Sequence, residues 1–119
     1  MNPKILWIAV LAVIAVLMLK SLAGSPSGDE KAAAKKKIAQ GALIVDVRAA
    51  QEFAGGNYTG ATNIPVQELK SRIGELGATN RAIVVYCRSG SRSASAKKIL
   101  LNAGFSDVSN AGALSDLQR

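Results

Sequence analysis

Residues 82–92 read Ala-Ile-Val-Val-Tyr-Cys-Arg-Ser-Gly-Ser-Arg, and this stretch contains the strongest signal for the fold. Its first half, 82–86, is continuously apolar and rich in β-branched residues, which is typical of a strand buried on both faces of a sheet. The second half is a short loop of arginine, serine and glycine, and a helical pattern follows from Ser93 to Ala103. A strand, a short loop and a helix in this order predict a unit of α/β type.

A similar alternation of elements continues toward the N-terminus. Residues 42–45 (Ala-Leu-Ile-Val) are also too continuously apolar for an edge strand, so we expect both runs to be central strands. Between them, the residue types predict a short helix at 49–53, an extended segment at 61–65 and a helical stretch at 66–76. This order predicts an α/β domain with a small, mainly parallel sheet flanked by helices.

An apolar run occupies the N-terminal part of the chain. No polar residue occurs from Ile5 to Leu19, and the run extends further if the Lys20 side chain reaches toward lipid headgroups. A run of this length suits the core of an export signal, which has about 7 to 15 apolar residues, whereas a membrane span needs about 20. We expect residues 1–24 to be a transmembrane anchor that contacts lipid through residues 5–24. A cleaved signal segment is the alternative.

The next segment separates that run from the folded domain. Residues 25–28 (Ser-Pro-Ser-Gly) are typical of a flexible linker, and Asp29 opens a short helix with acids at its start and lysines toward its end. We therefore divide the chain into an N-terminal segment at 1–24, a linker with the start of the first helix at 25–37, and a domain at 38–119. Roughly 80 residues suffice for one small domain.

Composition excludes several classes of function. The 119-residue chain has one cysteine and no histidine, so it can form no internal disulfide, and the usual zinc sites cannot be assembled. The net charge is +7, but residues 38–119 carry only nine Lys or Arg against six acids. Without a cluster of basic and aromatic residues, this excess gives little support for nucleic-acid binding. We expect no metal, and a small anionic substrate.

The single cysteine, Cys87, is the candidate nucleophile. It follows a predicted central strand and precedes a helix, where the backbone N–H groups of the loop converge on one point. We expect these dipoles, together with Arg88 and Arg92, to lower the pKa of the thiol. An inert thiol packed in the core is the alternative. The loop residues expected to bind an anion are Arg88, Ser89, Gly90, Ser91 and Arg92.

Several further motifs accompany this loop in a fixed order. They are Asp46-Val47-Arg48, Glu52-Phe53, Gly60-Ala61-Thr62-Asn63-Ile64-Pro65 and Asn110-Ala111-Gly112-Ala113-Leu114. Together with the loop they resemble the signatures of the rhodanese, or thiosulfate sulfurtransferase, family. The resemblance covers about residues 38–117 and is nearest to the small single-domain sulfurtransferases of phage-shock type. It implies a three-layer, rhodanese-like α/β fold.

The resemblance also implies a two-step transfer of sulfur on Cys87. The thiol takes a sulfane sulfur from a donor such as thiosulfate, and the resulting persulfide is attacked by cyanide or a thiol. By the same resemblance the two loop arginines hold the anionic donor, and no cofactor takes part. Asp46 and Arg48 form a framework beneath the loop. We expect Asp46 to pair with a cation of the loop, and Glu52 to be structural.

Two other functions remain as alternatives. Phosphatases and arsenate reductases of a related fold carry cysteine, five residues and then arginine, but the position where that arginine is required holds Ser93. Arg92 comes one residue earlier and closes a tighter loop, which suits a sulfur atom better than a phosphate. The second alternative is a membrane-tethered module that binds persulfide sulfur or senses redox state with little turnover.

The flanking charges bear on the side of the membrane that the domain occupies. One lysine precedes the apolar run and five follow it closely, a count that favours a cytoplasmic domain. A short apolar core with a lysine before it also fits an export signal, and the phage-shock resemblance implies the periplasm. We expect a membrane-associated protein with its domain in the periplasm. A cytoplasmic domain and a cleaved, soluble periplasmic form are the alternatives.

Overall fold

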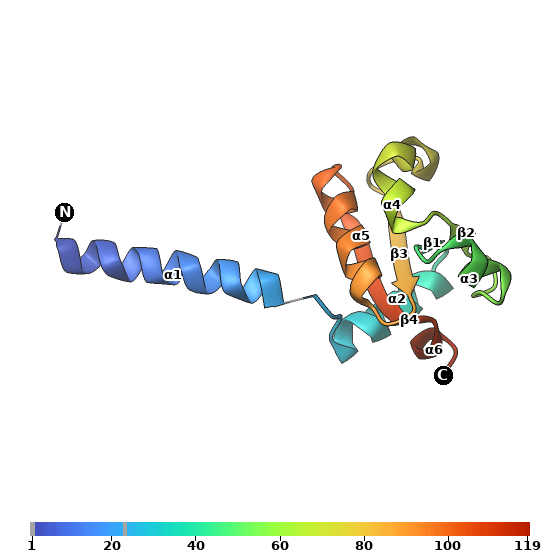
Figure 1. The fold of residues 1–119 in the computed structure, drawn as a ribbon, viewed down its shortest axis with the longest axis horizontal. Helices are drawn as coiled ribbons and strands as arrows, with labels where there is room; N and C mark the ends of the chain where they lie inside the picture. Colours follow the sequence, from blue (N-terminus) through green and yellow to red (C-terminus); the bar gives the residue numbers. More distant parts are fainter. Residues whose placement is uncertain (1, 23) are drawn as a thin grey trace.

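The folded part of the chain is built on one small sheet (Figure 1). The computed structural model describes residues 2–22 and 24–119, and its description of side chains omits residues 15–22. The strands are β1 Leu43–Asp46, β2 Thr62–Asn63, β3 Ala82–Cys87 and β4 Asp107–Ala113. They lie in the order β2-β1-β3-β4, and every neighbouring pair is parallel.

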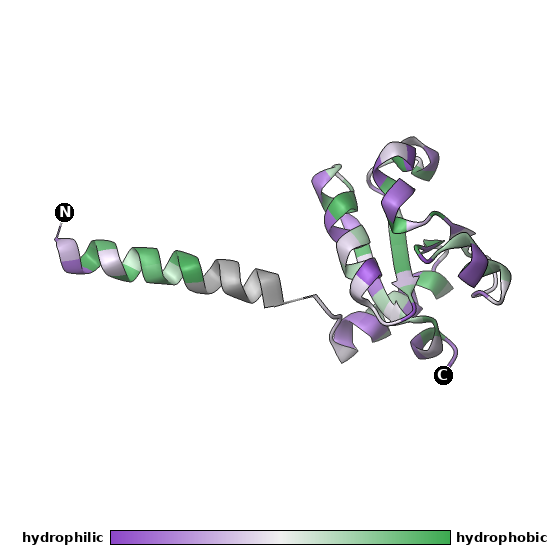
Figure 2. Cartoon of the chain, in the orientation of Figure 1, coloured by the Kyte–Doolittle hydropathy of each residue, from purple (hydrophilic) through white to green (hydrophobic). Residues whose placement is uncertain are grey.

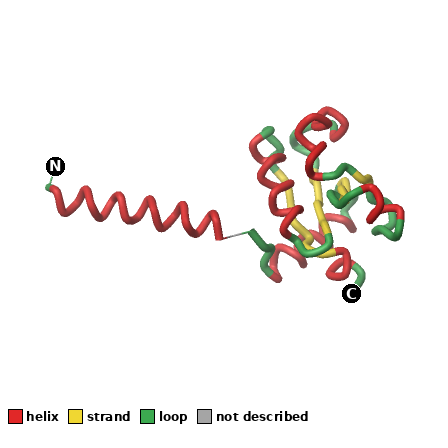
Figure 3. Tube along the Cα trace, in the orientation of Figure 1, coloured by secondary structure: helices red, strands yellow, loops and turns green. Residues whose placement is uncertain are grey.

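Helices cover both faces of this sheet (Figures 1 and 3). One face carries α2 Gly28–Ala39 and α6 Leu114–Leu117, and the other carries α4 Val66–Leu69, η1 Lys70–Leu76 and α5 Ser91–Asn102. The short helix α3 Ala50–Ala54 follows β1. This arrangement confirms the predicted α/β fold of three layers with a small parallel sheet flanked by helices.

Alternate residues of the central strands supply two apolar cores. Ile83 and Val85 of β3 pack with Leu100 on the face covered by α5, whereas Val84 packs with Ala34 of α2 on the opposite face. All five side chains are buried. Because both faces of β1 and β3 lie beneath helices, their sequences are continuously apolar, as in other parallel sheets.

The predicted elements match the structure except in the C-terminal part, where β4 and α6 were not predicted. The expectation that 42–45 and 82–86 form central strands is confirmed, since β1 and β3 lie between β2 and β4. The helix predicted at 93–103 begins two residues earlier, at Ser91. The residue types do not predict β4, because its sequence Asp-Val-Ser-Asn-Ala-Gly-Ala is mostly small and polar.

Helix α2 packs tightly on the sheet. The Ser27 side chain caps its first turn by accepting a hydrogen bond from the backbone N–H of Glu30, at 3.1 Å. Acids occupy the first turn and lysines the last, so the charges complement the helix dipole as predicted. Ala34 is fully buried against the sheet. The helix therefore packs against β3, the strand that carries Cys87.

Helix α1 Pro3–Leu22 stands apart from the domain in Figure 1. Its described side chains are exposed, and among the large apolar ones Trp7 is exposed to 67%. Figure 2 shows that the part of α1 with described side chains is mostly apolar. Among the residues described, no helix is both long and apolar enough to cross a membrane. The predicted segment at 5–24 lies partly outside the described side chains, so the anchor and the export signal stay predictions.

Strand β4 carries a one-residue bulge beside the end of β3. Asn110 pairs with Val85, and Ala113 pairs with Cys87, so three steps along β4 match two steps along β3. The extra residue is accommodated by Gly112, whose φ of 85° is a left-handed conformation. The bulge brings the backbone of β4 close to the loop that follows β3.

We predict that Gly112→Ala destabilises the domain by about 1–3 kcal/mol. The left-handed φ disfavours any side chain, and a Cβ atom would lie only 2.7 Å from Oδ2 of Asp116 and 3.0 Å from Cε of Lys31. Chemical denaturation of the two forms measures the difference in the free energy of unfolding. Gly74→Ala is the control, because a Cβ there meets nothing within 4 Å. Equal losses in both variants would contradict the importance of the bulge.

Candidate active site

Cys87 is the last residue of β3 and lies at the carboxyl edge of the sheet. Its side chain is fully buried in the core on the α5 side. A loop at 88–90 leads directly into α5, which begins at Ser91. A strand end, a short loop and a helix start therefore meet at the sulfur atom, as predicted from the sequence.

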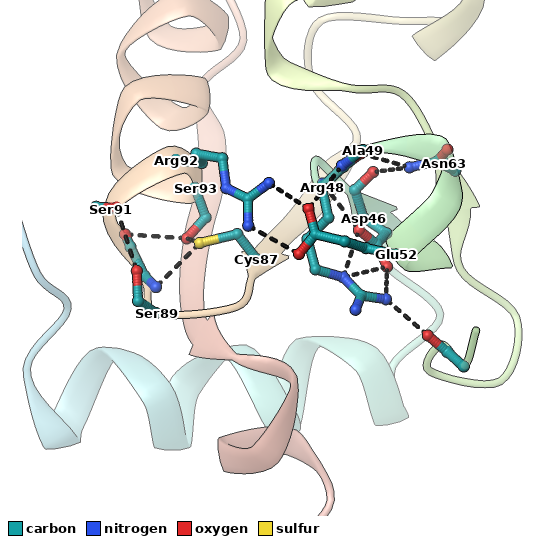
Figure 4. A network of polar contacts seen from close by, with 12 residues as sticks. Asp46, Arg48, Ala49, Glu52, Asn63, Cys87, Ser89, Ser91, Arg92 and Ser93 are labelled. Carbon is teal, nitrogen blue, oxygen red and sulfur yellow. Dashed lines mark hydrogen bonds and ion pairs between the residues drawn. The ribbon is translucent and has the colours of Figure 1, made fainter. Parts of the chain in front are cut away.

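Two residues contact the sulfur atom directly, and Figure 4 shows Ser93 beside it. The backbone N–H of Gly90 donates to Sγ of Cys87 over 2.9 Å, and Oγ of Ser93 lies 3.4 Å from the same atom. Gly90 has a φ of 97°, and a Cβ atom there would lie 3.4 Å from Cδ of Pro26. The glycine that the tight turn requires thus also directs its own N–H at the sulfur.

The pKa of Cys87 is the balance of two opposing effects. Burial raises the pKa of the thiol, but hydrogen bonds from the Ser93 hydroxyl and from the amides of Ser93, Ser89 and Gly90 lower it by more. The predicted lowering is confirmed, and its main source is this group of loop donors. Arg92 contributes less, because its strongest interaction is the hydrogen bond with Glu52 and its interaction with the charge of Cys87 is weaker. The loop thus stabilises the thiolate relative to that of a free cysteine, without a histidine.

Arg92 forms a two-pronged ion pair with Glu52 of α3. Nη1 lies 2.6 Å from Oε1, and Nη2 lies 3.0 Å from Oε2. The hydrogen bonds from Arg92 lower the pKa of Glu52 to about 2, so the carboxylate is ionised at neutral pH. Sequence reasoning gave Glu52 only a structural place and did not predict this partner. The positive charge that Arg92 presents to an anion is therefore partly neutralised by Glu52.

Asp46 pairs with Arg48 rather than with the loop (Figure 4). Nη2 of Arg48 lies 2.7 Å from Oδ2, Nε donates to both carboxylate oxygens, and the backbone N–H of Arg48 donates to Oδ1 over 2.9 Å. The expectation that Asp46 pairs with a loop cation is wrong, because the turn after β1 brings Arg48 onto the carboxylate. The Arg48 guanidinium also donates to the carbonyl of Gly56, so the buried pair also holds the backbone at Gly56 in place.

A pocket of about 470 Å³ opens beside the loop. It is lined by Arg48, Glu52, Arg88, Leu114, Ser115 and Gln118. Arg88 is exposed in this pocket. Ser89 and Ser91 are exposed outside its lining, and their hydroxyls lie 3.2 Å from each other. The hydroxyls predicted to serve the anion thus contact one another, and it is the Ser89 amide that acts on Cys87. Among the described residues, no group of three or more His, Cys, Asp or Glu could hold a metal ion.

Two buried polar side chains near Cys87 were not among the predicted site residues. Ser93 is fully buried and donates from Oγ to Oδ1 of Asn110 over 2.7 Å. The sequence carries a signal for Ser93, because it falls on the same helical face as Ala96 and Leu100, where a polar residue is unusual. For Asn110 the signal is weaker, because its contacts depend on the pairing of β4.

The fold and the site together define a class of protein: a small three-layer α/β domain with an activated thiol at the end of a central strand. Residues 30–112 match the model of the rhodanese-like domain family. The chain therefore belongs to the rhodanese-like domain family, as its motifs predicted.

Individual relatives agree with this membership. The chain is 39% identical over 74 residues to thiosulfate sulfurtransferase PspE of Escherichia coli strain K12, which covers 61% of this chain and 71% of that protein. A solved structure of a rhodanese with anions from E. coli matches with a TM-score of 0.60 and 39% identity, over 62% of this chain and 88% of that one. The human single-domain sulfurtransferase TSTD1 matches with a TM-score of 0.65 and 27% identity, over 80% and 95% of the two chains.

We predict that Ser93→Ala raises the pKa of Cys87, because it removes the hydroxyl that contributes most to the lowering. The thiolate fraction at neutral pH falls, so alkylation by iodoacetamide at pH 7 should slow by roughly three- to tenfold. The rate is measured as a function of pH. Ser95→Ala, on the exposed face of α5, should leave the profile unchanged. An unshifted profile in Ser93→Ala would show that the hydroxyl does not act on the sulfur.

Proposed function

We propose that this domain transfers sulfane sulfur. Cys87 takes a sulfur atom from an anionic donor such as thiosulfate, holds it as a persulfide and passes it to cyanide or a thiol. One observation carries the proposal: the Gly90 N–H lies 2.9 Å from a buried sulfur at the end of a central strand. Membership of the rhodanese-like family supports it, as does the similarity to a protein named thiosulfate sulfurtransferase.

In the first step, the Cys87 thiolate attacks the outer sulfur of thiosulfate. A new S–S bond forms on Cys87, the S–S bond of thiosulfate breaks, and its electron pair leaves with sulfite. In the second step, cyanide or a thiolate attacks the terminal sulfur, and Cys87 leaves as a thiolate. Neither step moves a proton, so the site needs hydrogen-bond donors for a negative sulfur rather than a general base. The amides of the loop supply donors of this kind.

We assign donor binding to Arg88 and Arg92. Arg88 is exposed and lines the pocket beside the loop, together with Arg48. Arg92 pairs with Glu52, which lines the same pocket, and so compensates the one acidic side chain among the lining residues. An anionic donor thus meets a rim with a net positive charge, which favours its binding.

Ser93 supports sulfur chemistry over phosphate chemistry. It occupies the position where the longer phosphatase loop requires arginine, and its side chain is buried against Cys87 instead of facing the pocket. A loop closed in this way leaves its amides to a small anion such as a terminal sulfur.

The N-terminal segment and the site of action belong to the same proposal. We propose that residues 1–24 act as a membrane anchor or as an export signal, that residues 25–27 join them to the domain, and that the domain works in the periplasm. The support is the apolar run from Ile5 to Leu19 with a lysine before it. The domain predicted at 38–119 begins earlier than expected, because Ala34 of α2 is buried against the sheet. The mass of the mature protein distinguishes a retained anchor from a cleaved signal.

We predict that Cys87→Ser abolishes the formation of thiocyanate from thiosulfate and cyanide. A serine hydroxyl cannot carry a persulfide, so mass spectrometry after exposure to thiosulfate should find no added species of about 32 Da, the mass of one sulfur atom. The unaltered protein should show both the thiocyanate and the added mass. Sulfur uptake with almost no thiocyanate would instead favour a persulfide-binding or redox-sensing module.

We predict that Arg88→Ala raises the KM for thiosulfate by roughly tenfold and changes kcat little, because the arginine contacts the donor but no reacting sulfur. Arg88→Lys should recover part of the loss, since it keeps the charge and loses the planar fork. Lys70→Ala removes one positive charge from η1 and is the control for long-range effects. If Lys70→Ala matches Arg88→Ala, the assignment of Arg88 is wrong.

A further inference from the structure

Asn110 of β4 is a buried polar residue at the bulge beside Cys87. Only 3% of its surface is exposed. It pairs with Val85, two residues before Cys87, at the point where the register of β4 shifts. Bulges next to functional sites commonly redirect a side chain, and here the side chain of Asn110 reaches the loop that follows β3.

The side-chain amide of Asn110 bonds at both ends. Oδ1 accepts from the N–H of Gly112 over 2.9 Å and from the Ser93 hydroxyl over 2.7 Å. Nδ2 donates to the carbonyl of Gly90 over 3.2 Å. The orientation of the amide is fixed, because a backbone N–H can only donate to an oxygen and a carbonyl can only accept from the nitrogen.

Its partners in the loop are the two residues that contact the sulfur. Gly90 directs its N–H to Sγ of Cys87, and Ser93 places its hydroxyl beside the same atom. The Ser93 hydroxyl has one proton and three neighbours: the sulfur, the Gly90 carbonyl and Oδ1 of Asn110. Oδ1 of Asn110 also accepts a hydrogen bond from the N–H of Gly112. The Ser93 hydroxyl can therefore turn from Oδ1 to an ionised sulfur, and Oδ1 still keeps one hydrogen-bond donor.

The backbone of Asn110 is held in turn by α2. Its N–H donates to Oε2 of Glu30 over 3.0 Å, and the same carboxylate oxygen pairs with Nζ of Lys97 on α5. Glu30 thus ties the first helix of the domain, the last strand and the helix that follows the loop at one point. Glu30, Lys97 and Asn110 line a second pocket of about 490 Å³, which shares no residue with the pocket beside Arg88.

We propose that Asn110 is a positioning residue of the Cys87 site. It holds the Gly90 carbonyl, so that the Gly90 N–H points at the sulfur, and it keeps the Ser93 hydroxyl beside the sulfur, to which that hydroxyl can turn its proton once the sulfur is ionised. The inference rests on the proposed function of Cys87 as the sulfur carrier. Asn110 neither lines the pocket beside Arg88 nor bonds to the reacting sulfur, so it acts through these two residues. It stabilises the charged sulfur of the thiolate and of the persulfide rather than the binding of the donor.

The test compares Asn110→Asp and Asn110→Ala with the unaltered protein. In Asn110→Asp an oxygen faces the Gly90 carbonyl and a negative charge is added near the sulfur. In Asn110→Ala the two loop residues lose their support without any added charge. We expect the pKa of Cys87 to rise in the order unaltered, Ala, Asp, and iodoacetamide alkylation at pH 7 to slow by roughly tenfold in the Asp variant. With thiosulfate, kcat should fall while KM changes little.

Asn102→Ala, at the exposed end of α5, is the matched control and should keep the alkylation profile of the unaltered protein. A lower melting temperature with an unshifted profile in Asn110→Asp would reduce Asn110 to a structural role and overturn the proposal. If that variant does not fold, the profile of Asn110→Ala decides in the same way. Alkylation needs no sulfur transfer, so this result is independent of the Cys87→Ser assay that tests the function.

Discussion

A negative charge on a buried sulfur atom is the constraint on which the rest of the structure depends. Cys87 is fully buried, and burial by itself favours the neutral thiol. The charge is stable only because amide hydrogens and one hydroxyl converge on it at the start of α5. That convergence needs the left-handed turn at Gly90, whose φ of 97° disfavours any residue with a side chain.

Local ion pairs determine how much charge the rim presents. Asp46 with Arg48 and Glu52 with Arg92 form two pairs on the same side of the loop. Each acid compensates its neighbouring arginine, and this leaves Arg88 as the exposed cation of the loop. The site thus combines a framework of neutralised ion pairs, of which Asp46 with Arg48 is buried, with the long, exposed side chain of Arg88 at the pocket. This division separates the loop amides and the hydroxyl that stabilise the sulfur from the arginines that bind the donor in the proposed function.

The central part of the fold and the nucleophile could be predicted from the sequence because their signals are local. The apolar runs of β1 and β3 and the loop after Cys87 need no distant partner to be recognised. Strand β4 could not be predicted in the same way, since its small and polar residues form a strand only by pairing with β3.

The partners within the site follow the same division. The pairing of Arg92 with Glu52 joins residues 40 positions apart, and the contact of Ser93 with Asn110 spans 17. Spacing along the chain carries no information about such contacts before the strand order is known. The expectation for Asp46 failed for the opposite reason, because its partner is only two residues away and depends on the turn after β1.

The bulge of β4 has a consequence for when the cysteine becomes chemically active. β4 follows α5 along the chain, so Asn110 reaches the loop only after β4 has joined β3. Before that step, during synthesis or in a locally opened state, the cysteine lacks preorganised donors and reacts as an ordinary thiol. The pairing of β4 with β3 therefore completes both the fold and the support of the groups that activate Cys87.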